Sequence, residues 1–149
     1  MKALLQILIF VPFSLKAQLT DWITVQSAYS SQQTVEALQK AVQQKGFKLF
    51  ATLDHSQEAE VAGLKLRPEI LLILGNPKVG TALMNCDARI GIALPLKILV
   101  WEDATGKVMA GFINPENFLK EYQLEDCKDI LPKMKAALKD LLSAVAKRN

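Results

Sequence analysis

Residues 75–103 read GNPKVGTALMNCDARIGIALPLKILVWED and combine glycines, prolines and polar side chains with an apolar run. A buried strand at residues 69–74 enters this block, turns through residues 75–77 and is expected to continue as a short helix. The chain then loops back through residues 91–95 and forms a strand at residues 96–101. A strand-to-helix junction leaves backbone N–H groups free to hold a ligand. The block is therefore both a fold-organising turn and the first candidate for a site.

Apolar alternation and helical spacing predict the elements on either side of this block. Ser30 and Gln33 form a capping-box pattern at the start of a helix, and Gly46 is well placed to end it. Asn114 is expected to cap another helix. The other predicted elements are strands at residues 22–29, 47–53 and 107–113, a short helix or compact loop at 54–63, and helices at 115–122 and 132–147.

Two of the strands carry specific expectations about their faces. Residues 69–74 form a continuous apolar run, which indicates a strand that is either covered on both faces or central in its sheet. The strand at residues 47–53 is expected to place one set of side chains on one face, namely Phe47, Leu49, Ala51 and Leu53. The loop before the last strand is a hairpin in which Gly106 is free to take positive φ.

The order of these elements predicts the fold class. Consecutive strands with few crossover helices favour an antiparallel sheet, whereas a doubly wound fold needs regular alternation of strand and helix. We expect an α+β two-layer sandwich, with a mainly antiparallel sheet and helices on one face. Residues 18–149 are long enough for one domain with a core and too short for two.

Residues 1–17 have the pattern of a secretory signal peptide. Lys2 is followed by a nearly continuous apolar run, which Pro12 interrupts and which Ala17 could end. The run is too short to span a bilayer. The sequence therefore predicts an exported protein, periplasmic or secreted, with no stable membrane insertion after cleavage. An uncleaved anchor or a first core element is the alternative.

The charge balance argues against nucleic-acid binding. Cleavage after Ala17 removes Lys2 and Lys16, so 18 basic and 15 acidic residues become 16 and 15, and the formal net charge falls from +3 to +1. A nucleic-acid surface needs a basic excess that the mature chain lacks. We therefore expect no nucleic-acid partner.

The chain has two cysteines, Cys86 and Cys127. In an exported protein they could form a disulfide, which would stabilise the fold by about 3–4 kcal/mol in the chain-entropy model. They could equally be two buried apolar residues. No spacing of cysteine and histidine has a recognisable zinc pattern, so no metal and no cofactor is expected.

The candidate ligand-binding residues lie mainly at the start of the predicted helix. A carboxylate or phosphate could bind the free N–H groups there, beside the Lys78 ammonium and the Thr81 hydroxyl. The alternative is an ordinary turn with a solvated lysine. Lys97, in an otherwise apolar strand, either extends to solvent at the sheet edge or projects into a polar site. The full candidate set is Gly75, Asn76, Lys78, Gly80, Thr81 and Lys97.

His55 is the only histidine and the only catalytic candidate. As a general base it would need an orienting partner, which could be Asp54, Glu58 or a residue of the block 75–103. Neighbours on a strand point to opposite faces, so Asp54 need not contact His55. The alternative is a histidine at a strand end that bonds a backbone carbonyl or water.

Short motifs between residues 24 and 124 have the order and spacing of one known family: Asp54-His55, Gly63, Arg67-Pro68, Leu74-Gly75-Asn76-Pro77-Lys78, Gly80-Thr81, Leu83-Met84, Leu94-Pro95-Leu96-Lys97 and Val100-Trp101-Glu102-Asp103. By these motifs the chain resembles the domain of unknown function 302 (DUF302) family. The resemblance implies a small α+β domain of the TATA-binding-protein-like fold class, fits a dimer, and implies no reaction. Where many members have an Arg-His pair, this chain has Glu121 and Tyr122, which removes a second histidine that could partner His55.

Three hypotheses about function follow. The first is a non-enzymatic exported domain that binds a small anionic ligand or a protein partner, as a homodimer. The second is an enzyme or enzyme accessory that uses His55 with Lys78 or Lys97. The third is a purely structural homodimerisation module that pairs through the strand at residues 96–101 and exposes an apolar patch near Trp101 or Phe112.

Overall fold

The fold is seen in a computed structural model that describes residues 21–147. The predicted signal peptide, residues 1–17, lies outside the described residues. The described chain forms one antiparallel five-stranded sheet with the strand order β1-β5-β4-β3-β2. The strands are β1 (Trp22–Gln26), β2 (Lys48–Asp54), β3 (Glu69–Gly75), β4 (Leu96–Glu102) and β5 (Val108–Ile113).

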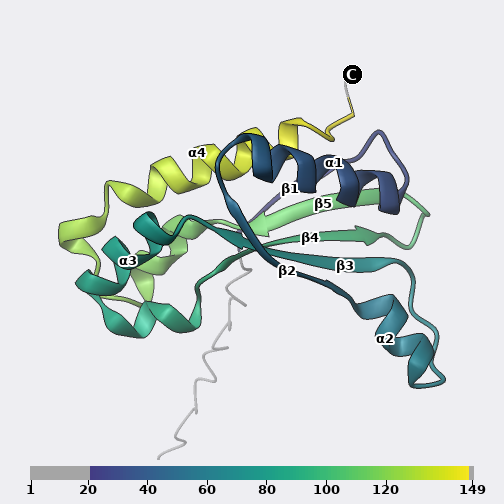
Figure 1. Ribbon diagram of the computed structural model, residues 1–149, viewed down its shortest axis with the longest axis horizontal. Coiled ribbons are helices and arrows are strands. Elements are labelled where there is room, and N and C mark those ends of the chain that lie inside the picture. Colours follow the sequence, from purple (N-terminus) through teal and green to yellow (C-terminus); the bar gives the residue numbers. More distant parts are fainter. Residues whose placement is uncertain (1–20, 148–149) are drawn as a thin grey trace, which may run out of the picture.

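Two long helices lie on one side of this sheet, α1 (Ser31–Gln44) and α4 (Ile130–Ser143) (Figure 1). The shorter helices α2 (His55–Val61) and α3 (Pro77–Cys86) lie at opposite ends of the molecule (Figure 1). Three 3₁₀ helices complete the described chain: η1 (Ala88–Ile92), η2 (Pro115–Lys120) and η3 (Glu125–Cys127). The predicted α+β sandwich with helices on one face is confirmed.

The predicted helix ends match the structure where a local signal fixes them. Ser30 caps α1 through a capping box with Gln33, and Gly46 follows the helix with φ +74°. Asn114 caps η2 by accepting a hydrogen bond from the Glu116 amide. The last helix begins two residues before the predicted start, so that Pro132 sits in the first turn, where a missing N–H costs nothing.

The core lies between the sheet and the two long helices. From the sheet, Leu72, Leu74, Ile98 and Val100 are fully buried. The helices contribute their apolar stripes, which are Leu38 and Val42 from α1 and Leu131, Leu138, Leu141 and Leu142 from α4. Two layers with one buried interface are therefore enough for this fold.

Strand β3 is interior, because β2 and β4 pair with its two edges. The alternative of cover on both faces is wrong: Leu72 and Leu74 are buried, but Leu71 and Ile73 on the other face are only half-buried. The apolar run therefore reflects an interior strand with a second, less covered apolar face.

The predicted face pattern of β2 is also wrong beyond its first half. The pairing register with β3 shifts between Leu49 and Ala51, so Phe50 is an extra residue in the strand. Phe47 and Leu49 pack against the core, whereas Leu53 is 39% exposed. One inserted residue moves all later side chains to the opposite face.

The β4–β5 hairpin forms as predicted, with Gly106 at φ +79°. The Asp103 carboxylate accepts hydrogen bonds from the Thr105 and Lys107 amides and from the Thr105 hydroxyl. These bonds, the Thr105 hydroxyl first, lower the pKa of Asp103. Asp103 therefore closes the turn between β4 and β5.

Candidate functional site

A groove of about 730 Å³ opens at the end of the sheet where β3 runs into α3 and β4 begins. One wall is α3, a second is the first half of α4, and the chain before β4 and the start of β2 complete it. The lining residues are Phe47, Phe50, residues 75–82, Met84, Gly91, Leu94, Pro95, Leu96, Ile130, Lys133, Met134 and Ala137. Segments distant in sequence thus build a single concave surface.

Most of the side chains that line this groove are apolar, and within residues 21–147 the charged groups that line it are two lysines. Lys78 is on α3 and Lys133 is on α4, so the two walls contribute one ammonium group each. Neither ammonium has a carboxylate within ion-pair distance among residues 21–147. The Asn76 amide and the Thr81 hydroxyl are the other polar side-chain groups.

The start of α3 has fewer free N–H groups than the sequence suggests. Asn76 is the N-cap, and its side-chain oxygen accepts a hydrogen bond from the Lys78 amide at 3.0 Å. Pro77 has no N–H, and the Gly80 amide donates to the Asn76 carbonyl at 2.9 Å. Within residues 21–147, the Val79 amide is the one N–H of this turn without a hydrogen-bond acceptor. An anion here would be held by lysine charge and the helix dipole more than by backbone amides.

The structure brings together five of the six predicted ligand-binding residues. Gly75, Asn76, Lys78, Gly80 and Thr81 all line the groove. Lys97 is not part of the lining: its side chain is exposed, and its ammonium donates to the carbonyls of Ala93 at 3.3 Å and Pro95 at 3.0 Å. The five stay candidates for ligand contact, and Lys97 lies outside the groove.

His55 is far from these residues. It is the first residue of α2, and α2 and α3 lie at opposite ends of the molecule (Figure 1). Asp54, the last residue of β2, is the N-cap of α2. Its carboxylate accepts hydrogen bonds from the Ser56 hydroxyl and the Gln57 amide, so His55 follows it in a helix and not in a strand. These bonds, Ser56 first, lower the pKa of Asp54. In this arrangement His55 and Lys78 do not form a shared site.

The α4 wall of the groove could not be predicted from the sequence. The apolar periodicity of residues 132–147 predicted that this helix packs on the sheet, which Met134 does. Lys133 is not among the candidate residues that the sequence indicates. Its place in the groove depends on the position of α4 over the sheet end, which no local signal encodes.

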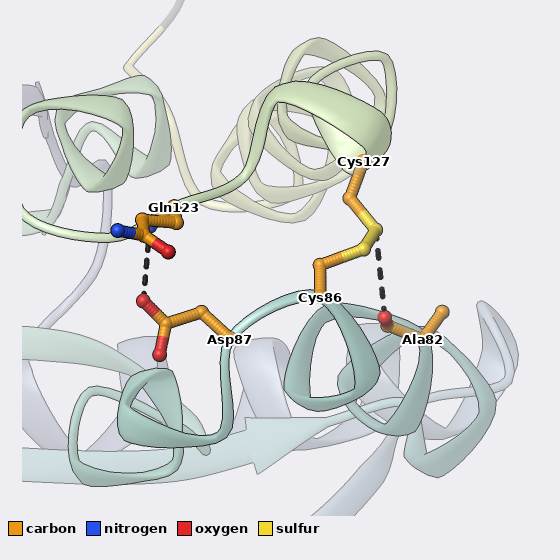
Figure 2. The surroundings of a disulfide bond; sticks show 5 residues. All are labelled: Ala82, Cys86, Asp87, Gln123 and Cys127. Atoms are coloured by element: carbon orange, nitrogen blue, oxygen red, sulfur yellow. Dashed lines mark hydrogen bonds between the residues drawn. A yellow bond between two sulfur atoms is a disulfide. The ribbon is translucent and has the colours of Figure 1, made fainter.

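A disulfide joins the two walls of the groove. Cys86, the last residue of α3, is bonded to Cys127 in η3, three residues before α4 begins, and their Cα atoms are 6.5 Å apart (Figure 2). The Cys127 sulfur also lies 3.5 Å from the Ala82 carbonyl oxygen. A disulfide sulfur has no proton to donate, so this approach is a packing contact. Of the two alternatives left open by the sequence, the structure has the disulfide.

Asp87 makes a second link between the same segments. Its carboxylate accepts two hydrogen bonds from the Arg89 guanidinium, at 2.7 and 3.0 Å. It accepts another from the backbone N–H of Gln123 at 2.9 Å (Figure 2). The Asp87 residue is 9% exposed. The Arg89 side chain first, and then the Gln123 amide, hold the pKa of Asp87 well below its usual range. Charged hydrogen bonds therefore reinforce the covalent link.

Residues 21–147 contain neither a metal-binding cluster nor a membrane-spanning helix. No group of three or more histidine, cysteine, aspartate or glutamate side chains could hold a metal ion there. In the same residues, every helix is too short or too polar to cross a membrane.

Several known proteins are similar to this chain. It is 36% identical over 108 residues to a protein named fluoride-specific ion channel FluC 1 in Brucella suis, which covers 72% of this chain and 42% of that protein. The protein of the same name in Brucella abortus matches at the same identity over 40% of its length. The chain thus spans about two-fifths of the curated relatives it matches.

A solved structure shares the fold. The crystal structure of an uncharacterized conserved DUF302 protein from Bacillus stearothermophilus superposes with a TM-score of 0.76 at 22% identity, covering 83% of this chain and 97% of that one. The model of the family described as domain of unknown function DUF302 matches residues 23–141. The resemblance seen in the central motifs is thereby confirmed, and this chain belongs to the DUF302 family.

Proposed function

We propose that this chain is a non-enzymatic binding domain whose groove takes an amphipathic carboxylate, with an apolar body and one acidic head. The observation that carries the proposal is the groove itself: about 730 Å³, lined mainly by apolar side chains, with two lysines that form no ion pair among the described residues. Its volume is in the range of small-molecule sites, about 300–1,000 Å³.

The lining decides between an amphipathic ligand and a small polar anion. A phosphate or a short carboxylate would contact Lys78 or Lys133 and leave Phe47, Phe50 and Leu94 facing water. A ligand with an apolar body covers those side chains, and each buried methylene group stabilises the complex by about 0.8 kcal/mol. Apolar burial therefore provides most of the affinity, and the lysines orient the head.

Two methionines suit a flexible apolar body. Met84 comes from α3 and Met134 from α4, so the two facing walls each contribute one. Methionine is unbranched and adapts to irregular shapes. We therefore propose a straight-chain acid as the ligand class.

The direct test is titration calorimetry of the purified protein with octanoate, decanoate and dodecanoate. Each added pair of methylene groups should tighten binding about tenfold until the groove is full. The neutral alcohols of the same lengths should bind more weakly and with the same dependence on length. No saturable binding, or an affinity independent of chain length, would refute the proposal.

Lysine variants test the head-group contact separately. Lys78→Met and Lys133→Met should each weaken dodecanoate binding about tenfold, because a hydrogen bond to a charged group is lost. Dodecanol binding should not change. Lys107→Met, in the β4–β5 hairpin, is the matched control, since Lys107 is not in the groove lining. Equal losses for acid and alcohol would show that the lysines only shape the groove.

We propose that the protein works in an oxidising compartment, consistent with export. The Cys86–Cys127 disulfide supports this, since such bonds persist in oxidising environments and are rare in the cytosol. Alkylation of intact cells before and after reduction measures the thiol state. Free thiols on both cysteines in the native host would contradict this part of the proposal.

A second candidate function comes from the curated relatives, whose names state a fluoride-specific ion channel. Because this chain matches only two-fifths of each, we propose as the alternative that it associates with such a channel and does not itself conduct. The test mixes the purified chain with the part of the Brucella suis protein that it does not match, in detergent, and follows co-elution. Separate elution at micromolar concentration would reject this alternative.

A further inference from the structure

The sheet has a second apolar face, turned away from α1 and α4, which we call the open face (Figure 1). Its central row runs across all five strands through the paired residues Leu53, Leu71, Leu99, Gly111 and Thr24. One outer row consists of Ala51, Ile73, Lys97, Ile113 and Trp22. The other outer row consists of Glu69, Trp101, Met109 and Gln26. Nine of these fourteen residues have apolar side chains.

These apolar side chains are only partly shielded within residues 21–147. Trp22 is 44% exposed and Ile113 is 45% exposed, at one edge of the face. Leu71, Leu99 and Trp101 are half-buried near its centre. A monomer rarely exposes a contiguous apolar patch of several hundred Å², and such patches mark interaction surfaces.

Two tryptophans form a ridge on this face. Trp22 and Trp101 contact each other edge to face, with ring centroids 6.0 Å apart and planes at 72°. They come from β1 and β4, and the residue between them on β5 is Gly111, which has no side chain to separate the rings. Aromatic side chains at the centre of a patch are the usual anchors of protein interfaces.

The edges of the sheet are less suited to pairing than this face. On the edge strand β2, the register shift at Phe50 interrupts the ladder that a new strand would need. The other edge strand, β1, is only five residues long. Bulges and short edge strands are devices that prevent edge-to-edge association. A partner is therefore expected on the open face.

We propose that the partner is a second copy of this chain, packed open face to open face. Strands about 4.8 Å apart and three rows of side chains give a face of about 24 Å by 20 Å. Two such faces bury about 1,000 Å², which reaches the lower limit for a specific interface. The dimer is then stabilised chiefly by apolar contact.

The charges on the open face fix the orientation of the two copies. Lys97 lies in one outer row and Glu69 in the other, on neighbouring strands. We place the two-fold axis of the dimer midway between the two sheets, parallel to the row that contains Leu71 and Leu99 and therefore perpendicular to the strands. Rotation about this axis places each outer row of one copy opposite the other outer row of its partner. Lys97 of each copy then lies one strand spacing from Glu69 of the other. The Lys97 ammonium has three N–H groups and uses two on the carbonyls of Ala93 and Pro95, which leaves one for this contact.

The wild-type protein tests the proposal without any substitution. Light scattering and sedimentation should give twice the chain mass at micromolar concentration and the chain mass on dilution. The only two tryptophans of the chain are both on the open face, so acrylamide quenching of their fluorescence should rise in step with dissociation. A monomer at all concentrations overturns the proposal. In that case, freely quenched tryptophans would show that the open face of the monomer is exposed to solvent. Protected tryptophans would show that another part of the chain covers the open face.

Matched variants locate the interface. Leu71→Glu should raise the dimer dissociation constant about 100-fold, because each dimer then buries two unpaired charges. Ile92→Glu is the control, since Ile92 is 84% exposed and lies in η1, outside the open face. Circular dichroism and dodecanoate titration verify that both variants fold. A dimer that Leu71→Glu leaves intact refutes the proposed interface.

A charge exchange tests the orientation. Lys97→Glu should raise the dissociation constant about threefold, as expected for a rim charge pair, and Glu69→Lys added to it should restore the wild-type value. Failure of the second change to restore dimerisation would overturn the proposed two-fold arrangement.

Discussion

The two ends of the molecule share a local design and differ in how they are anchored. At one end β3 leads into α3 through the cap Asn76, and at the other β2 leads into α2 through the cap Asp54. Leu83 of α3 is fully buried, and the helix continues into the Cys86–Cys127 disulfide. In contrast, no residue of α2 is buried. A capped strand–helix junction becomes part of a groove only where tertiary contacts hold its helix.

The largest expected difference between the two ends comes from the disulfide. Replacing both Cys86 and Cys127 with alanine should lower the free energy of unfolding by about 3–4 kcal/mol, because the unfolded chain regains the freedom of a loop with a sequence separation of 41. Urea unfolding followed by circular dichroism measures it. The wild-type protein in reductant should behave like the variant, and a loss below about 1 kcal/mol would mean that the link adds little to noncovalent packing.

Core packing should separate the two ends next. Leu83→Ala in α3 should cost about 3 kcal/mol, because it leaves a cavity in a fully buried site. Leu64→Ala, just after α2, makes the same chemical change where the side chain is 66% exposed, and it should alter stability by less than about 0.5 kcal/mol. Both losses are measured as the free energy of unfolding in chemical denaturation. Equal losses for the two variants would contradict the conclusion that α3 is anchored more firmly than α2.

The Asp87 link should make the α3 end sensitive to acid. Because the folded pKa of Asp87 is lowered, its stabilising effect is fully present above the unfolded value of about 4 and declines as pH falls below it. Asp87→Asn should therefore melt at a lower temperature than the wild type near neutral pH, and the gap should narrow in acid. Melting curves at a series of pH values measure the gap. A gap that stays constant with pH would show that charge is not involved.

The smallest effect is expected at the α2 cap. Asp54→Ala removes the acceptor for the Gln57 amide and should destabilise α2 by about 1 kcal/mol. Because α2 contributes no buried residue, the loss should appear as about fivefold faster amide exchange in this helix, with global melting unchanged. Glu60→Ala, in the same helix but away from the cap, is the control. A lowered global melting temperature would indicate that α2 is anchored after all.

The sequence predicts the parts of the fold that depend on local chemistry. Ser30 with Gln33, Gly46 and Asn114 each satisfy a backbone requirement within a few residues, and the structure confirms all of them. The antiparallel sheet also follows from the order of the elements. Backbone requirements of this kind do not depend on what packs nearby.

The parts that the sequence misses depend on long-range packing. The bulge at Phe50 is hidden because β2 has apolar residues on both faces, so alternation does not fix its register. Only part of the candidate site was predicted: the α3 wall follows from a turn motif, but Lys133 and Met134 reach the groove only because α4 begins beside it. Whether Cys86 meets Cys127 likewise depends on where two distant segments come together.

Gly111 limits which sequences this fold can accept. A Cβ atom there would lie 2.8 Å from the Thr24 Cγ2 and 2.9 Å from the Ile23 carbonyl oxygen, both on the neighbouring strand β1. Even alanine would force β1 away from β5 and separate the two tryptophans that meet above the glycine. Gly111 therefore sets the spacing between β1 and β5, and in a library of variants it should be among the least tolerant positions of the sheet.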